Sequence, residues 1–290
     1  MFGHTFGRIP VLSLVALTVA LAGCETVGRT GPTQRIAVQD DGSPESSSVN
    51  IASLTEVIQR NPGDPGAYNT RGAAYARAGR YSDAIADFGK ALQIDPNHAP
   101  AYTNRALAFR QTNRNDAALA DFTRAIQADP NYAPAYIGRA NLLRVQGNFA
   151  EALSDLSIAV RLTPESAETL HARGLVYQRM GQHQQAILDF DAAIDRNAFV
   201  AAPYAARGQS LVQTGQFDKA IEDFNAALNV DNRNAEAWAW RGIAYERQGR
   251  KQEAVESFQR ALTVDNSNAT ARQGLSRVQG GGGGVASFFR

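Results

Sequence analysis

The stretch PGAYNTRGAAYARAGRYSDAIADFGKALQIDPNH, residues 65–98, decides the fold because its pattern returns five more times without any change in spacing. Arg71 begins an Arg-Gly or Arg-Ala pair that recurs every 34 residues, at Arg105, Arg139, Arg173, Arg207 and Arg241. A 34-residue self-similarity is typical of a solenoid built from pairs of helices. We number the positions of each copy from 1 to 34, so that residue 65 is position 1 and Arg71 is position 7.

Other columns keep the same period and predict two amphipathic helices in each copy. Alanine stands at positions 20 and 27 in every copy, and Phe or Leu stands between them at position 24. Within a copy, apolar residues recur at steps of three and four, which is the helical period. Small residues let two helices approach closely, and aromatic side chains fill the gaps beside them. Glycine at position 15, replaced by Asn113 in the second copy, predicts the turn between the helices, and a closing Asp-Pro or weakened form ends the second helix.

These columns resemble the tetratricopeptide repeat. The resemblance implies an all-α, right-handed superhelical solenoid of antiparallel helix pairs. Residues 50–64 match the second helix of a preceding copy and are interpreted as an N-terminal half repeat, and residues 269–279 resemble a capping helix. The fold hosts many roles, so it predicts function only weakly. The six full copies are 65–98, 99–132, 133–166, 167–200, 201–234 and 235–268.

The first 23 residues differ in kind from the repeats and predict a signal peptide. An apolar run from Ile9 to Ala22 follows a weakly positive start and is too short to span a bilayer comfortably. It ends in Leu21-Ala22-Gly23-Cys24, which resembles the lipobox of bacterial lipoproteins. That resemblance implies cleavage before Cys24 and acylation of this residue, with palmitate among the acyl groups. The alternative is a structural cysteine after an ordinary secretory signal; in either case a single cysteine forms no internal disulfide.

The segments on either side of the repeats predict flexible chain. Residues 24–49 are rich in Gly, Ser, Pro, Asp and Thr and predict a lipidated tether. In enteric-type lipoproteins an aspartate after the lipidated cysteine resembles an inner-membrane retention signal. Glu25 stands there instead, which implies transport to the outer membrane, facing the periplasm. Residues 280–290 begin with five glycines and predict a disordered tail, the alternative being a hydrophobic peptide that docks into a partner or the groove.

Composition narrows the function classes. The chain has 29 Lys and Arg against 28 Asp and Glu, and removal of residues 1–23 would leave a formal net charge of zero. This balance argues against a general nucleic-acid binder. The sequence contains no phosphate-binding glycine loop, nucleophile elbow or metal-spaced cluster. We therefore expect no catalytic residue, cofactor or metal.

The arginine column at position 7 has two interpretations. It is either a basic stripe that binds an acidic ligand or a salt bridge between helices repeated along the scaffold. An aspartate column at position 23 has the same period, and the planar fork of arginine suits a carboxylate, so we favour the salt bridge. Pairing within a copy would leave Arg241 opposite Ser257, whereas pairing between copies would leave Arg71 opposite Ser53. We lean to the within-copy pairs, which are Arg71 with Asp87, Arg105 with Asp121, Arg139 with Asp155, Arg173 with Asp189, and Arg207 with Asp223.

The family resemblance places positions 2, 5, 9, 12 and 13 of the first helices on a concave groove. These positions vary from copy to copy while the packing columns do not. A specific partner-binding groove and a set of unconstrained solvated residues both fit that contrast. The mixture of small apolar, amide and arginine side chains suits a peptide with some acidic character. The predicted partner-binding residues are Asn69, Arg77, Thr103, Arg110, Ile137, Asn141, Arg144, His171, Arg179, Gln209, Gln213 and Arg247.

We therefore expect a binding protein rather than an enzyme: a membrane-anchored periplasmic scaffold for proteins of the cell envelope. The layout is similar to that of the NlpI family of repeat lipoproteins, which bring peptidoglycan hydrolases and a periplasmic protease together. The alternative is a pilotin-like lipoprotein that assists the assembly of a secretin or a pilus. The sequence identifies neither the partner nor the oligomeric state.

Overall fold

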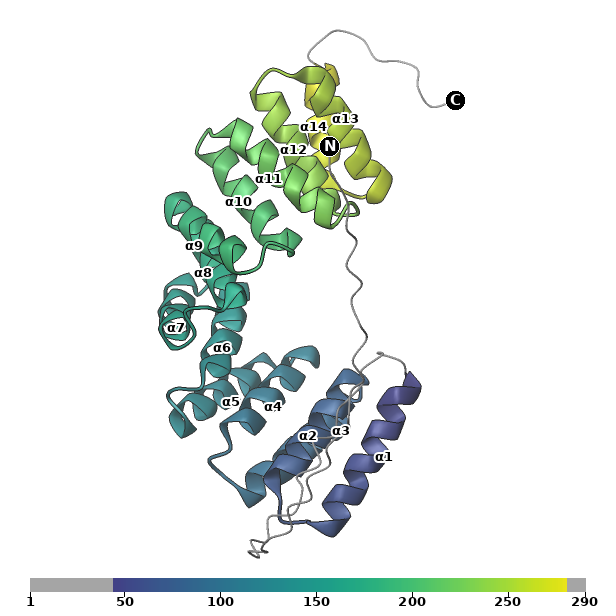
Figure 1. Cartoon of the computed structure of the whole chain (residues 1–290), viewed down its shortest axis with the longest axis vertical. Helices are drawn as coiled ribbons and strands as arrows, with labels where there is room; N and C mark the ends of the chain where they lie inside the picture. Colours follow the sequence, from purple (N-terminus) through teal and green to yellow (C-terminus); the bar gives the residue numbers. More distant parts are fainter. Residues whose placement is uncertain (1–43, 281–290) are drawn as a thin grey trace, which may run out of the picture. The chain divides into compact units, whose positions relative to one another are not determined.

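The computed structural model describes residues 44–280, which form fourteen α-helices and no strand. Figure 1 shows these helices following one another as pairs along the array. The architecture is the all-α superhelical repeat fold that the 34-residue period predicts. The predicted signal peptide, Cys24, most of the tether and the tail from residue 281 lie outside the described residues.

Each copy consists of a first helix of 13 residues and a second helix of 14 residues. The first helices are α2 (Pro65–Arg77), α4 (Ala99–Gln111), α6 (Ala133–Val145), α8 (Ala167–Arg179), α10 (Ala201–Gln213) and α12 (Ala235–Arg247). The second helices are α3 (Tyr81–Ile94), α5 (Asn115–Ala128), α7 (Phe149–Leu162), α9 (His183–Arg196), α11 (Phe217–Val230) and α13 (Lys251–Val264). The array opens with α1 (Pro44–Arg60) and closes with α14 (Ala269–Gly280).

The half repeat and the capping helix are both present. Leu54 and Ile58 of α1 are buried, and α1 packs on α2 in the way that a second helix packs on the next copy. The helix begins at Pro44, so the predicted tether is wrong for residues 44–49. Proline is favoured at a first helical position because the N–H that it lacks would have no helical partner there. At the other end, α14 contacts α12 and α13, as the first helix of a further copy would.

The side chain at position 24 fills the space between its own first helix and the next. Phe258 is fully buried, and a Cβ atom added at Gly242 would lie 2.6 Å from its ring. In the second copy Ala106 takes the place of this glycine. There the room comes from Gly138 of the next copy, where an added Cβ would lie 2.2 Å from the ring of Phe122. Small residues on the first helices are therefore a condition for burying the aromatic rings.

The turn inside each copy needs a left-handed residue at position 15. The glycines at this position have φ between 72° and 85°, and Asn113 has φ 59°. Side chains disfavour this region, and asparagine tolerates it better than other residues. The structure thus confirms the turn position that the sequence predicts.

The first helices lie on the inner side of the superhelix. Each one contacts the first helix of the next copy, whereas no two second helices contact each other within residues 44–280. The first helices are therefore closer together, which is the geometry of a curved repeat array with a concave surface. Within the same range, no helix combines the length and the apolar character that crossing a membrane requires.

Candidate functional site

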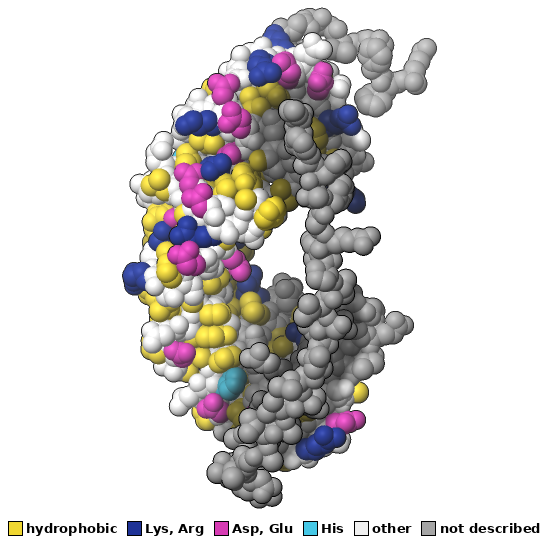
Figure 2. Space-filling view, viewed as in Figure 1, with side chains coloured by type: hydrophobic (Ala, Val, Ile, Leu, Met, Phe, Trp, Pro, Cys, Tyr) yellow, Lys and Arg dark blue, Asp and Glu magenta, His cyan; other side chains and the backbone are white. Residues whose placement is uncertain are grey.

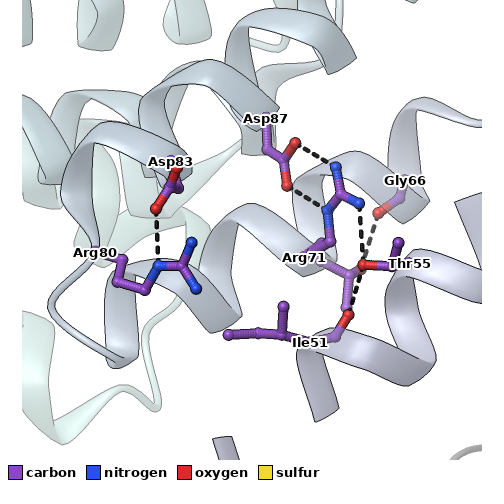
Figure 3. A network of polar contacts seen from close by, with 8 residues as sticks. Ile51, Thr55, Gly66, Arg71, Arg80, Asp83 and Asp87 are labelled. Atoms are coloured by element: carbon purple, nitrogen blue, oxygen red, sulfur yellow. Dashed lines mark hydrogen bonds and ion pairs between the residues drawn. The ribbon is translucent and has the colours of Figure 1, made fainter. Parts of the chain in front are cut away.

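Arg71 shows how the arginine column is used (Figure 3). Its Nε and Nη2 atoms donate to Asp87 Oδ2 and Oδ1 at 2.7 and 2.8 Å, which is the within-copy pair. Its Nη1 atom donates to Thr55 Oγ1 of α1 at 3.1 Å. One guanidinium group thus joins its own helix pair to the preceding helix. A separate, half-exposed pair between Arg80 and Asp83 follows at the turn.

The same two-pronged pair is formed in the next four copies, where Nε lies 2.6 to 2.8 Å from the aspartate Oδ2. Each of the five aspartates is at most 7% exposed. The hydrogen bond to the carboxylate raises the pKa of each arginine, which therefore stays charged. We call these contacts the arginine braces. They are the predicted pairs of Arg71 with Asp87, Arg105 with Asp121, Arg139 with Asp155, Arg173 with Asp189, and Arg207 with Asp223.

Sequence reasoning missed the residue that the remaining arm of the arginine contacts. In four of the six cases this residue is at position 25 of the preceding copy: for example, Thr123 accepts from Arg139 at 3.2 Å, and Asp191 accepts from Arg207 at 2.6 Å. The signal that could have indicated it is the polar residue that stands sixteen residues before five of the six arginines, at position 25. Arg105 has Gly89 at this position, and within the described residues its side chain forms hydrogen bonds with Asp121 alone.

The sixth arginine is held without a carboxylate. Arg241 Nη1 donates to Asn225 Oδ1 at 2.7 Å, and its Nε lies 3.3 Å from Ser257 Oγ. The guanidinium lies over the ring of Trp238, 4.3 Å from the centroid. Burial without a facing acid lowers the pKa of Arg241. The whole column is thus engaged in the scaffold, and a partner has to bind elsewhere.

Four of the predicted groove residues meet in one pocket on the inner surface. The pocket has a volume of about 480 Å³ and lies between α6, α8, α10 and α12. It is lined by the predicted Arg144, Arg179, Gln209 and Gln213, together with Leu175, Gln178, His183, Glu236 and Trp240. Residues from four successive first helices therefore contribute to a single hollow, which the local sequence of any one copy does not reveal.

The column at position 5 is mostly engaged with the scaffold. Thr103 is 3% exposed, so its predicted contact with a partner is wrong: contacting first helices cover this short side chain. Asn69 accepts from Asn104 Nδ2 at 2.9 Å, across to the next first helix. Ile137 packs against the core of the third copy. The ring of His171 lies 5.6 Å from that of Phe190, and burial together with Arg144 lowers its pKa.

The remaining predicted groove residues are accessible but lie outside this pocket. Arg77 and Arg247 are exposed, and Arg110 and Asn141 are half-buried. Arg77, Arg110, Arg144, Arg179 and Arg247 form a second set of arginines, at positions 12 and 13, which we call the inner arginines. Among the described residues none of them forms an ion pair, in contrast to the braced arginines.

The charges of the inner arginines act on one another. Burial and the neighbouring charges of Arg179 and Arg110 lower the pKa of Arg144. Elsewhere the surface is mixed: acidic and basic side chains are interspersed over the face in Figure 2. No group of His, Cys, Asp and Glu in the described part of the chain could hold a metal ion. The arrangement is thus suited to binding an anionic group by hydrogen bonds and charge.

Comparisons with known proteins agree with the repeat architecture. Profiles of the tetratricopeptide repeat match residues 65–98, 103–167, 167–199 and 205–269, which together make up more than half of the chain. No curated protein matches the sequence.

Many solved structures match the fold. YrrB, "a TPR protein with an unusual peptide-binding site", is 25% identical, with a TM-score of 0.55 over 64% of this chain and 96% of its own. PilW, a "widely conserved type IV pilus biogenesis factor", is 18% identical, with a TM-score of 0.65 over 72% of this chain and 97% of its own. One chain of the Cut9-Hcn1 hetero-tetramer of the APC/C is 21% identical to this chain, with a TM-score of 0.70 over 82% of this chain. The match spans 46% of the chain from that assembly.

Proposed function

The chain belongs to the tetratricopeptide repeat family, and on that premise we propose that it is a lipid-anchored scaffold of the bacterial envelope that binds protein partners through its inner surface. Its repeats form a protein-interaction scaffold. One observation carries the choice of surface: the brace and packing columns are satisfied internally, whereas the inner arginines have no ion-pair partner among the described residues.

The N-terminal sequence supports the envelope location. The apolar run ends at the lipobox-like Leu21-Ala22-Gly23-Cys24, and Glu25 follows in place of an aspartate. On this proposal Cys24 is acylated and the protein is held at the outer membrane, facing the periplasm. Several acyl chains anchor a protein stably, whereas a single chain binds only marginally.

The anchor is tested with a Cys24→Ala variant expressed in a bacterium that processes lipoproteins. The unmodified protein should sediment with the outer membrane and incorporate labelled palmitate, and the variant should do neither. A variant that still sediments with membranes would contradict the lipid anchor but would leave the partner-binding proposal untouched.

The partners that we propose are peptidoglycan hydrolases or a protease of the envelope. Crosslinked envelopes are purified through the scaffold, using the original chain, an Arg144→Glu/Arg179→Glu variant and an Arg161→Glu/Arg260→Glu control. The two control arginines are exposed on second helices and form no ion pair among the described residues. The proposal expects hydrolases or proteases that disappear in the inner-surface variant and remain in the control. Equal recovery in both variants would exclude the inner surface as their binding site.

The pilotin-like role is the second candidate, supported by the likeness to PilW. At 18% identity this likeness is one of fold. The same purification distinguishes the two roles, because recovery of secretin or pilus subunits in place of hydrolases and proteases would favour assembly.

A further inference from the structure

The pocket on the inner surface contains two arginines that form no ion pair among the described residues. Arg144 Nε is buried and has no hydrogen-bond partner among the described residues. Arg179, an exposed residue of the next first helix, lines the same pocket and is close enough for its charge to act on Arg144. A second buried atom without a partner, His183 Nδ1, belongs to a residue that also lines the pocket. Buried groups of this kind are costly unless a ligand or water satisfies them.

The acidic residue of the pocket is committed elsewhere. Glu236 Oε1 accepts from Trp240 Nε1 at 2.7 Å, and Glu236 Oε2 accepts from Asn268 Nδ2 at 3.2 Å. Both carboxylate oxygens are therefore used at the α12 side, and no ion pair joins Glu236 to the arginines of α6 and α8. The two arginines thus have no carboxylate in ion-pair contact among the described residues, and their side of the pocket is positively charged.

The amides of the pocket have two different roles. Gln178 Nε2 donates to Ala206 O and Ser210 Oγ, both at 2.9 Å, and so ties α8 to α10. Gln209 and Gln213 form no side-chain hydrogen bond among the described residues. An amide side chain can both donate and accept, so these two suit the main chain of an extended peptide.

We propose that this pocket is an anchor site that binds a carboxylate group of a partner peptide through Arg144 and Arg179, with Gln209 and Gln213 on the adjoining main chain. The inference rests on the proposed function, because it specifies the chemistry of the partner at the same surface. A planar guanidinium binds a carboxylate with two parallel hydrogen bonds, as the arginine braces of this chain already do. The carboxylate belongs either to an acidic side chain or to the end of the partner chain.

The test uses four fluorescein-labelled octapeptide pools and the purified full chain. Two pools carry Asp or Glu at alternate positions, and two carry Asn or Gln there. One pool of each kind ends in a carboxylate and the other in an amide. Fluorescence anisotropy measures binding to the original chain, to Arg144→Gln/Arg179→Gln and to the matched control Arg161→Gln/Arg260→Gln. Circular dichroism verifies that both variants keep their helical content.

We expect at least one carboxylate-bearing pool to bind about tenfold or more tightly than the pool that has only amides. The inner-surface variant should lose this preference, and the control should keep it. A preference that follows the side chains identifies an acidic segment as the ligand, and one that follows the terminus identifies the chain end.

Equal binding of the acidic and amide pools, or a preference that survives in the inner-surface variant, would overturn the carboxylate site. The same holds if no pool binds. In each of these cases the scaffold proposal is tested separately, by the loss or retention of crosslinked envelope partners in the Arg144→Glu/Arg179→Glu protein.

Discussion

Replacing Asp121 with serine tests whether the arginine braces stabilise the array and whether their strength depends on the neighbouring copy. The change copies the natural break at Ser257, where serine faces Arg241. In the second copy it removes the two hydrogen bonds from Arg105, at 2.6 and 2.9 Å. Because Gly89 offers no side-chain acceptor, Arg105 would then have no carboxylate or amide partner among the described residues, and would keep only the new serine hydroxyl and the rings of Tyr102 and Phe109.

The expected cost follows from the burial of the pair. Removing one partner of a buried ion pair costs about 3–5 kcal/mol. Arg105 keeps 19% of its side chain exposed while Asp121 keeps 5%, so water can solvate the arginine in part. We therefore expect Asp121→Ser to lower the free energy of unfolding by about 2–3 kcal/mol. Asp223→Ser should cost less, about 1–2 kcal/mol, because Arg207 retains Asp191 at 2.6 Å.

The assay is urea unfolding followed by circular dichroism and fitted with a nearest-neighbour model, since a repeat array need not unfold as one unit. Hydrogen exchange of the amides in α4 and α5 reports the local effect. Asp195→Ser, at an exposed site near the end of α9, is the control and should change stability by less than about 0.5 kcal/mol. Equal losses for the Asp121 and Asp223 variants, or a loss at Asp121 no larger than the control, would refute the reasoning.

Three further outcomes are expected. Ser257→Asp should complete the sixth brace and raise the free energy of unfolding, measured with urea, by about 1 kcal/mol. A lower free energy of unfolding would contradict this and would indicate overpacking of the fully buried site. Gly249→Ala should destabilise by roughly 1–2 kcal/mol because of its φ of 77°, whereas Asn113→Gly should be near neutral; thermal unfolding of the two variants checks this contrast. The pKa of His171 is lowered in the folded state, so the unfolded chain takes up its proton first and stability falls as the pH drops below about 6.5. His171→Gln should reduce the difference between urea midpoints at pH 7.5 and pH 5.5, and an unchanged difference would contradict this assignment.

Much of the fold follows from the sequence because each copy makes its decisive contacts locally. Alanine and aromatic columns at helical spacing, a left-handed residue at position 15 and a closing Asp-Pro specify two helices and the turn between them. The Arg71–Asp87 pair could be predicted by the same reasoning, because residues 16 apart lie at one level of an antiparallel helix pair. The start of α1 at Pro44 could not be predicted, because a polar Ser-rich segment is equally typical of a flexible tether.

The functional surface depends on distances between copies, which only the tertiary structure decides. The sequence by itself determined that arginine recurs every 34 residues and that aspartate follows with the same period. Packing decided that five of these arginines form braces and that four of the six reach a residue of the preceding copy. It also decided that Thr103 is covered and that Arg144 and Arg179 meet residues of α10 and α12 in one pocket. The physical reason is that helix formation is set by neighbours in the chain, whereas the burial and partners of a charge are set by the curvature that brings successive first helices together.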